Sequence, residues 1–244
     1  MARRKAMIMA MVAPTVIAMD NRALFHLMSW MSPSYPVGAY TYSHGLEYAV
    51  EVGLITGLGD LVPWIADILE HGDGKSDSIL LAAAHRAARN EDLSALREVA
   101  ELGYAFCSTA ELALETTAQG RAFTRVISDV ATAPSLEALQ GLWNGPLVHP
   151  LVLAIVAADH DIGLPETLTA YLHGFVSNLV SAAVRIIPLG QTDGQRAIAG
   201  LAGDLARTVR KAESSTLENL GTATLMVDWC SSLHETQYTR LFRS

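Results

Sequence analysis

Three short stretches of the sequence carry residues that could do chemistry. "HGDGKS", residues 71–76, contains the Gly-Lys-Ser of a phosphate-binding loop. Ser43 directly precedes His44, and such a pair could provide a nucleophilic hydroxyl and the general base that activates it. Cys230 and His234 are spaced i, i+4, so a helix would place both on one face, where they could bind a metal. Each stretch points to a different kind of site, and its surroundings decide whether that site is real.

The surroundings argue against all three sites. A phosphate-binding loop requires a glycine five residues before Gly74, where the chain has Leu69. Such a loop also follows a β-strand, whereas this stretch follows a predicted helix. "YSHG" lacks the glycines that flank a nucleophile elbow, so we interpret Ser43 and His44 as turn residues. A packed cysteine and an exposed histidine explain the last pair equally well. The sequence therefore predicts no catalytic residue, no metal ligand and no cofactor.

Composition restricts the partners of the chain. Half of its 244 residues are hydrophobic, which is enough for a substantial core. The formal net charge of −8 argues against nucleic acid, which is bound by a surplus of Lys and Arg. Two cysteines, Cys107 and Cys230, are too few for a disulfide scaffold and predict a reducing, cytoplasmic location, although one bridge between them stays open.

The first 20 residues have two interpretations. "ARRK" followed by an apolar stretch resembles a secretory signal, with Ala18 at the cleavage point. Pro14 interrupts that stretch, and the stretch is shorter than the roughly 20 apolar residues that span a bilayer. We therefore expect residues 1–20 to form a mobile extension, and we expect no association with a membrane.

The rest of the chain follows the helical period. Leu24, Leu27, Met28 and Met31 are spaced i, i+3, i+4, i+7, as on the buried face of a helix. Ser108 with Glu111 predicts a helix start, the longest helix should run from Pro165 to Pro188, and a further helix should begin at Thr192. No linker or internal repeat divides the chain. The sequence predicts an all-α fold, a single-domain bundle of about ten helices over residues 21–244.

Residues 32–47, "SPSYPVGAYTYSHGLE", combine aromatic side chains with residues that bend the backbone. Prolines stop the preceding helix, and glycines allow close backbone approach. Such a turn could present Tyr42 and His44 to a protein partner, or it could pack them onto the bundle. Both interpretations are open.

The C-terminal tail "QYTRLFRS" mixes aromatic and apolar residues with arginines, a composition typical of interface hot spots. The residues concerned are Tyr238, Arg240, Leu241, Phe242 and Arg243. Either the tail folds back onto the bundle, or it is loose until a partner orders it.

Three segments together resemble the UreF family of urease accessory proteins. They are "LMSWMSPSYPVGAYTYSHGLEYAVEVGLI", "YLHGFVSNLVSAAVRIIPLGQTDGQ" and "HETQYTRLFRS", and they occur in the family's order between about Leu24 and Ser244. No single segment is long, and residues 1–20 lie outside the resemblance.

The resemblance implies a non-catalytic protein that forms homodimers. It would join UreD, called UreH in some organisms, and the GTPase UreG in delivering nickel to apo-urease. By the same resemblance, the helix that carries Arg185 lies near the surface that meets UreG or the dimer mate, so Arg185 could contact UreG, although the helix dipole alone also accounts for a cation near this helix end. The resemblance further implies that the tail is loose until it orders against UreD, so deleting residues 235–244 should abolish UreD binding and leave the melting temperature nearly unchanged. The alternative is a helical small-molecule-binding enzyme, but we see no pattern of carboxylates or histidines on inward helix faces.

Overall fold

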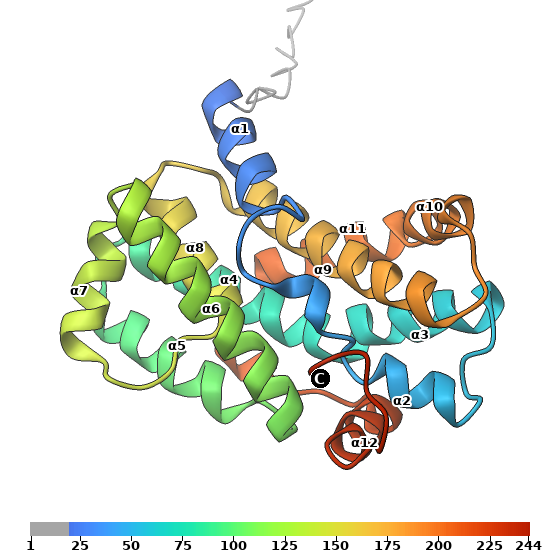
Figure 1. Cartoon of the computed structure of the whole chain (residues 1–244). Coiled ribbons are helices and arrows are strands. Elements are labelled where there is room, and N and C mark those ends of the chain that lie inside the picture. Colours follow the sequence, from blue (N-terminus) through green and yellow to red (C-terminus); the bar gives the residue numbers. More distant parts are fainter. Residues whose placement is uncertain (1–19) are drawn as a thin grey trace, which may run out of the picture.

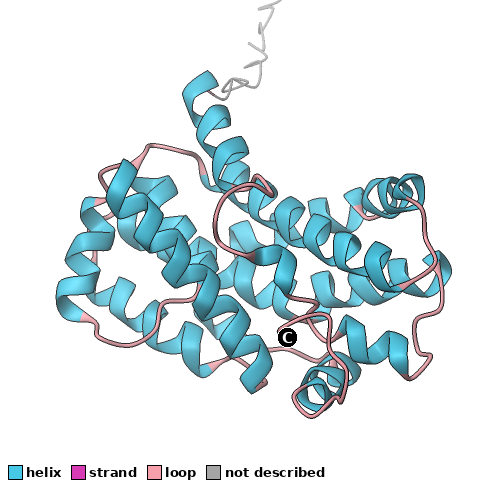
Figure 2. Cartoon of the chain, viewed as in Figure 1, coloured by secondary structure: helices cyan, strands magenta, loops and turns pink. Residues whose placement is uncertain are grey.

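The computed structural model describes residues 20–244, and regular structure in that range is helical, with no strand (Figure 2). The α-helices are α1 (Asn21–Trp30), α2 (Leu46–Glu51), α3 (Leu58–His71), α4 (Asp73–Arg89), α5 (Leu93–Ala105), α6 (Ala110–Val130), α7 (Pro134–Leu142), α8 (His149–Asp159), α9 (Leu164–Ile186), α10 (Gln191–Gly200), α11 (Ala202–Ser214) and α12 (Leu225–His234). Two short 3-10 helices, η1 (Ala39–Thr41) and η2 (Leu217–Asn219), complete the list. The prediction of an all-α fold is confirmed.

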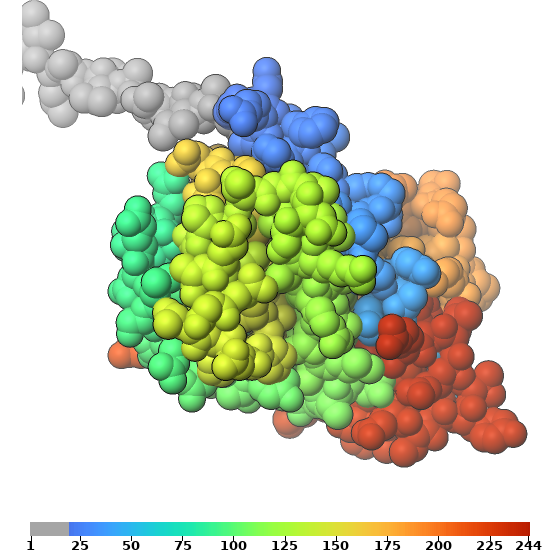
Figure 3. Space-filling model, turned by 60° about the vertical axis from the view of Figure 1, so that its left-hand side comes forward, coloured from blue at the N-terminus to red at the C-terminus, as the bar shows by residue number. Residues whose placement is uncertain are grey.

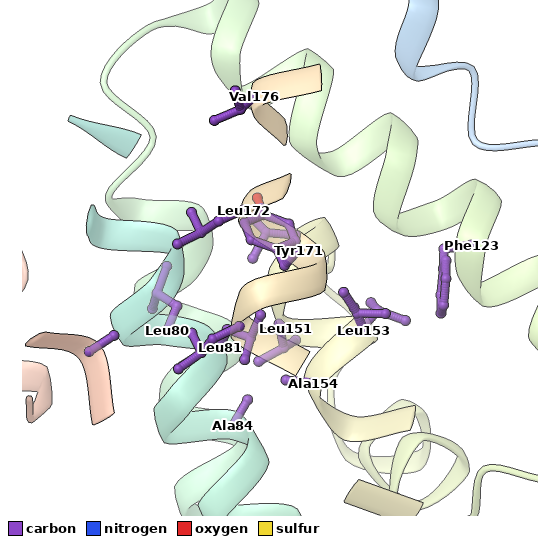
Figure 4. Close-up of a cluster of buried hydrophobic side chains, with 14 of the residues drawn as sticks. Leu80, Leu81, Ala84, Phe123, Leu151, Leu153, Ala154, Tyr171, Leu172 and Val176 are labelled. Atoms are coloured by element: carbon purple, nitrogen blue, oxygen red, sulfur yellow. The ribbon is translucent and has the colours of Figure 1, made fainter. Parts of the chain in front are cut away.

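One hydrophobic core reaches from α1 to α12. Its centre is α8, in which every residue from His149 to Ala158 is buried, because the stretch "HPLVLAIVAA" has no polar face. The helix packs against α4, and α6 and α9 cover other sides of it. Figure 4 shows this contact, with Leu81 of α4, Leu153 of α8 and Leu172 of α9 among the buried side chains.

The predicted helix ends were partly wrong. Thr109, not Ser108, caps α6 and accepts a hydrogen bond from the Leu112 N–H, because the Ser108 hydroxyl donates to Asp228 instead. The chain also turns at Leu201 and divides the predicted helix after Thr192 into α10 and α11. The described residues hold twelve α-helices where about ten were predicted, and this break accounts for one of the additional helices.

The prediction of a mobile extension and its alternative, a secretory signal, fall on residues 1–19, outside the described part of the chain. Asp20, which the prediction placed in the extension, caps α1 through its side chain. Helix α1 projects from the bundle near one end of α9 (Figure 1). Within residues 20–244 no helix combines the length and the hydrophobicity that crossing a lipid bilayer would require.

The stretch that contains Gly-Lys-Ser has a structural role, and the two cysteines form no disulfide. The Gly-Lys-Ser stretch lies in the turn from α3 into α4 and the first turn of α4, and Gly72 is both the C-cap of α3 and the N-cap of α4. Cys107 and Cys230 are both free thiols, so the single disulfide that the sequence left open is absent.

Candidate functional site

The C-terminal tail folds back onto the bundle. It runs between α12 and the segment around η1, and Figure 3 shows it lying against that segment and α6. The Arg243 N–H donates to the Thr41 carbonyl at 2.8 Å, and the Ser43 N–H and hydroxyl donate to the Ser244 carbonyl at 2.7 and 2.6 Å. Phe242 is 3% exposed and Ser244 is fully buried. The expectation of a loose tail is therefore wrong.

Glu47, at the start of α2, holds the tail backbone. Its two carboxylate oxygens accept from the Leu241 N–H at 2.6 Å and the Phe242 N–H at 3.0 Å. Gly45 makes this position possible, since a Cβ there would lie 2.9 Å from the Ser231 nitrogen of α12, and its φ of 78° is in the left-handed region. The close approach of α2 to α12 thus directs Glu47 at the tail.

His234, the last residue of α12, lies between two carboxylates. Its Nε2 is 3.0 Å from Glu47, and its Nδ1 is 3.0 Å from Glu111 in the first turn of α6. The other oxygen of Glu111 lies 3.5 Å from the Arg240 guanidinium. His234 is fully buried, so the imidazole joins α2, α6 and α12 beneath the tail. The sequence-based interpretation of an exposed histidine at this position is wrong.

His44 forms a second buried cluster next to the first. It has a φ of 58°, in the left-handed region that a non-glycine residue rarely adopts. Its Nε2 lies 3.2 Å from Asp73 and its Nδ1 3.5 Å from Glu115, although neither contact has hydrogen-bond geometry. The Ser244 hydroxyl bonds to the same oxygen of Glu115 at 3.0 Å. The end of the chain is therefore linked to α4 and α6 through this cluster.

Two arginines lie over aromatic rings at the same place. The Arg185 guanidinium is 4.2 Å from the centre of the Phe242 ring and donates to the Tyr40 carbonyl at 2.5 Å. The Arg243 guanidinium is 5.8 Å from the centre of the Tyr42 ring. Cations over ring faces are attracted by about 0.5–1 kcal/mol at exposed sites. Arg185 therefore fastens the tail to α9, beyond the helix-dipole effect that its position near the C-terminus of α9 predicts.

The structure brings the predicted partner-binding residues from three distant segments into one place. Within it they divide into two groups. Tyr42, His44 and Phe242 are buried within the chain, so their role in this structure is to hold the tail, and for Tyr42 the packing interpretation applies. The others reach the surface: Tyr238 is fully exposed, Leu241 is 61% exposed, and Arg185, Arg240 and Arg243 are exposed as well.

Five side chains of this site were not predicted as site residues. They are Asp73, Glu111, Glu115, Glu47 and His234. A signal existed for two of them, because Glu47 ends the aromatic turn and His234 begins the tail segment. Within residues 20–244, no group of three or more His, Cys, Asp and Glu side chains is arranged to hold a metal ion, so Cys230 and His234 belong to no such group.

The His44 cluster predicts how stability depends on pH. Burial alone would lower the pKa of His44, but the Asp73 and Glu115 carboxylates outweigh it and raise the pKa from 6.5 to about 10. The folded chain thus holds this proton more tightly than the unfolded chain. The stabilisation is complete below pH 6.5 and is lost as the pH rises toward 10. Urea unfolding should show the free energy of unfolding falling across this range.

The matched variant is His44→Gln, which removes the titrating group. We expect the free energy of unfolding of this variant to fall less steeply between pH 6.5 and 10 than that of the wild type. Because the comparison concerns slopes, it holds even if the variant is less stable throughout. Identical slopes would show that His44 is not the group responsible.

Comparisons with known proteins identify relatives of this chain. The UreF family model matches residues 55–202, more than half of the chain. A protein from Granulibacter bethesdensis named "Urease accessory protein UreF" is 49% identical over 232 residues, which cover 95% of this chain and 98% of that protein. Proteins of the same name from Bradyrhizobium diazoefficiens and Rhodopseudomonas palustris (strain HaA2) are each 46% identical, over 95% and 93% of this chain and 96% of each relative.

The alignments with these relatives extend well beyond the matched family region and include nearly the whole length of each protein. Identity of this degree over aligned lengths of more than 220 residues is far above the level at which a shared fold and ancestry are in doubt. The chain therefore belongs to the UreF family.

Proposed function

We propose that this chain is a urease maturation factor that acts without catalysis. It serves as an adaptor between UreD, or UreH, and the GTPase UreG, and it helps to deliver nickel to apo-urease. The observation that carries the proposal is the 43–49% identity, over more than nine-tenths of the chain, to proteins named urease accessory protein UreF. The working form is a homodimer held on UreD that orients two UreG molecules.

The outer face of the folded tail suits a contact with UreD. Tyr238 and Leu241 point apolar surface outward, while Arg240 and Arg243 add charge beside them. Exposed Tyr40 lies on the adjoining η1 segment. Aromatic residues and arginines on a base already fixed by hydrogen bonds lose little conformational entropy on binding. The docked tail is thus a preformed binding surface and not a disordered segment that must become ordered on binding.

Replacing both Tyr238 and Leu241 by alanine should abolish most UreD binding without changing the fold. Neither side chain is buried, so the melting temperature should stay within about 1 °C of the wild type. Pull-down with tagged UreD measures the binding, and thermal unfolding serves as the control. Wild-type retention of UreD by the double variant would place the contact elsewhere on the chain.

Arg185 has a second proposed role, in contact with UreG. Its guanidinium is exposed although it touches the Phe242 ring and the Tyr40 carbonyl, so donors remain for a partner. An Arg185→Ala variant should retain UreD and lose affinity for UreG. If this variant instead loses both partners, the arginine acts by holding the tail. If the variant binds UreG with wild-type affinity, Arg185 is not part of the UreG interface.

The direct experiment is co-purification of the tagged chain with UreD and UreG from cells that express all three. We expect a complex that contains two copies of this chain, together with both partners, by light scattering after gel filtration. Recovery of the chain alone, with neither partner, would contradict the adaptor function. Cells that express untagged UreG without this chain provide the control, which measures non-specific binding of UreG to the affinity resin.

The alternative is a helical enzyme that binds a small molecule, although the sequence shows no pattern of carboxylates and histidines on inward helix faces. The structure corrects that observation. Asp73, Asp77, Glu115, His44 and His149 all line one interior cavity. These residues favour ligand binding, and the adaptor function remains the proposal because the relatives are named as accessory proteins.

A further inference from the structure

An interior cavity of about 240 Å³ lies between the base of α1, the turn that follows it, and helices α4, α6, α8 and α9. Exposed side chains stand at its rim, among them Tyr40 and Phe106, so the cavity opens to the surface. The inner wall is formed by Asp73 and Asp77 of α4 and Glu115 of α6, together with His44. His44 and Glu115 of this wall also belong to the His44 cluster, which holds Ser244 at the end of the tail.

The charges on this wall are not balanced. Three carboxylates, those of Asp73, Asp77 and Glu115, face one imidazolium, that of His44. His44 pairs with Asp73 and Glu115, while Asp77 has only the Tyr171 hydroxyl, at 2.5 Å. Buried carboxylates are stable when a cation or several donors meet them. The wall therefore holds more carboxyl groups than cations.

Asp77 is the carboxyl group of this wall for which no ion pair is found within the described residues. Burial, with Asp73 nearby, raises the pKa of Asp77 to about 7, so near neutral pH this carboxyl is about half protonated, and a cation beside it would favour the ionised form. Its side chain nevertheless keeps some accessible surface, and it lines the cavity. The Asp77 carboxyl group therefore lies deep in the protein and is accessible to a ligand in the cavity.

A second observation points to a ligand. His149 is 5% exposed and lines the same cavity, and its Nε2 has no hydrogen-bond partner within the described chain. Burial lowers the pKa of His149 to about 4, so the imidazole ring is neutral and can accept a hydrogen bond from an N–H group. The Tyr35 hydroxyl, also on the wall, is buried and unpartnered as well. Buried polar groups of this kind are normally satisfied.

We propose that this cavity binds a small organic cation, with a guanidinium or primary ammonium group held against Asp77 and Asp73. The N–H groups of such a cation meet the carboxylates and the His149 acceptor, and its charge favours the ionised form of Asp77. The aromatic rings of Trp30, Tyr35 and Phe175 line the cavity and suit the cation and its apolar part. A metal ion fits less well, because within the described residues no three of these side chains converge as ligands.

The test compares two probes of nearly equal shape. Methylguanidinium carries the charge, and N-methylurea is its uncharged counterpart. Titration calorimetry on the full chain should show saturable binding of methylguanidinium at one site per chain, and binding of N-methylurea at least about tenfold weaker, as the loss of one charged hydrogen bond predicts. Equal affinity for both probes, or no binding of methylguanidinium, overturns the proposal.

Variants locate the site. Asp77→Asn keeps the shape of the side chain and should weaken methylguanidinium binding about tenfold or more. Asp161→Asn is the matched control, since that carboxylate is 85% exposed and pairs with Arg89 outside the cavity. Removing the buried charge at Asp77 should not unfold the chain, which thermal unfolding verifies. Unchanged binding by Asp77→Asn, or equal weakening by both variants, would show that the cation binds elsewhere.

Discussion

Deletion of residues 235–244 is expected to lower the melting temperature by roughly 10 °C. The deletion exposes the surface that buried Phe242 covers, worth about 1.5–3 kcal/mol. It also leaves the Glu47 carboxylate without the two backbone donors of the tail, at a further cost of about 1–3 kcal/mol. Thermal unfolding followed by circular dichroism measures the sum of both losses.

The matched control is the double variant with alanine at Tyr238 and Leu241, which alters the tail only on its exposed side. Its melting temperature should equal that of the wild type. The truncated chain and the double variant therefore distinguish the buried side of the tail, which stabilises the fold, from the exposed side, which binds the partner. A truncated chain that melts at the wild-type temperature would show that the tail is not docked in solution, and the preformed surface for UreD would then be wrong.

The second large effect is expected from His234→Ala. The imidazole is fully buried and lies 3.0 Å from both Glu47 and Glu111, so its removal leaves two buried carboxylates facing one another. Breaking a buried pair in this way costs about 3–5 kcal/mol of the free energy of unfolding. Urea unfolding of the variant and the wild type at the same pH measures the difference.

A second substitution tests the cause of this loss. Adding Glu111→Gln to the His234→Ala chain removes one of the two opposed carboxylates and should restore part of the lost stability. Replacement of exposed His173 by alanine is the control and should change little. If Glu111→Gln makes the His234→Ala chain still less stable, the loss comes from the cavity left by the ring and not from the carboxylates.

The helices were predictable because their signal is local. The spacing of apolar residues and the positions of Pro and Gly are read within one turn or two, as in α9, which the sequence places between Pro165 and Pro188 and the structure between Leu164 and Ile186. Helix ends were less certain, since Ser108 is drawn to Asp228, a residue 120 positions away. Such competition for a hydroxyl is absent from any local pattern.

The site was predictable only in outline. The composition of the tail and of the aromatic turn marked both as unusual, and the structure brings them together with Arg185. Whether the tail is loose or docked depended on Glu47, which bonds to Phe242 across 195 positions of the chain. Nothing in the spacing of a single glutamate shows that it turns inward. The same is true of Asp77 and His149, whose common cavity appears only when α4 and α8 are packed.

The most direct test of the adaptor function is activation of apo-urease. Urease subunits, UreD and UreG are produced in cells supplied with nickel, with or without this chain, and urease activity and bound nickel are measured in the purified enzyme. We predict active, nickel-loaded urease only when the chain is present, and apo-urease when the chain is absent. Full activity and nickel content without the chain would contradict its role in urease maturation.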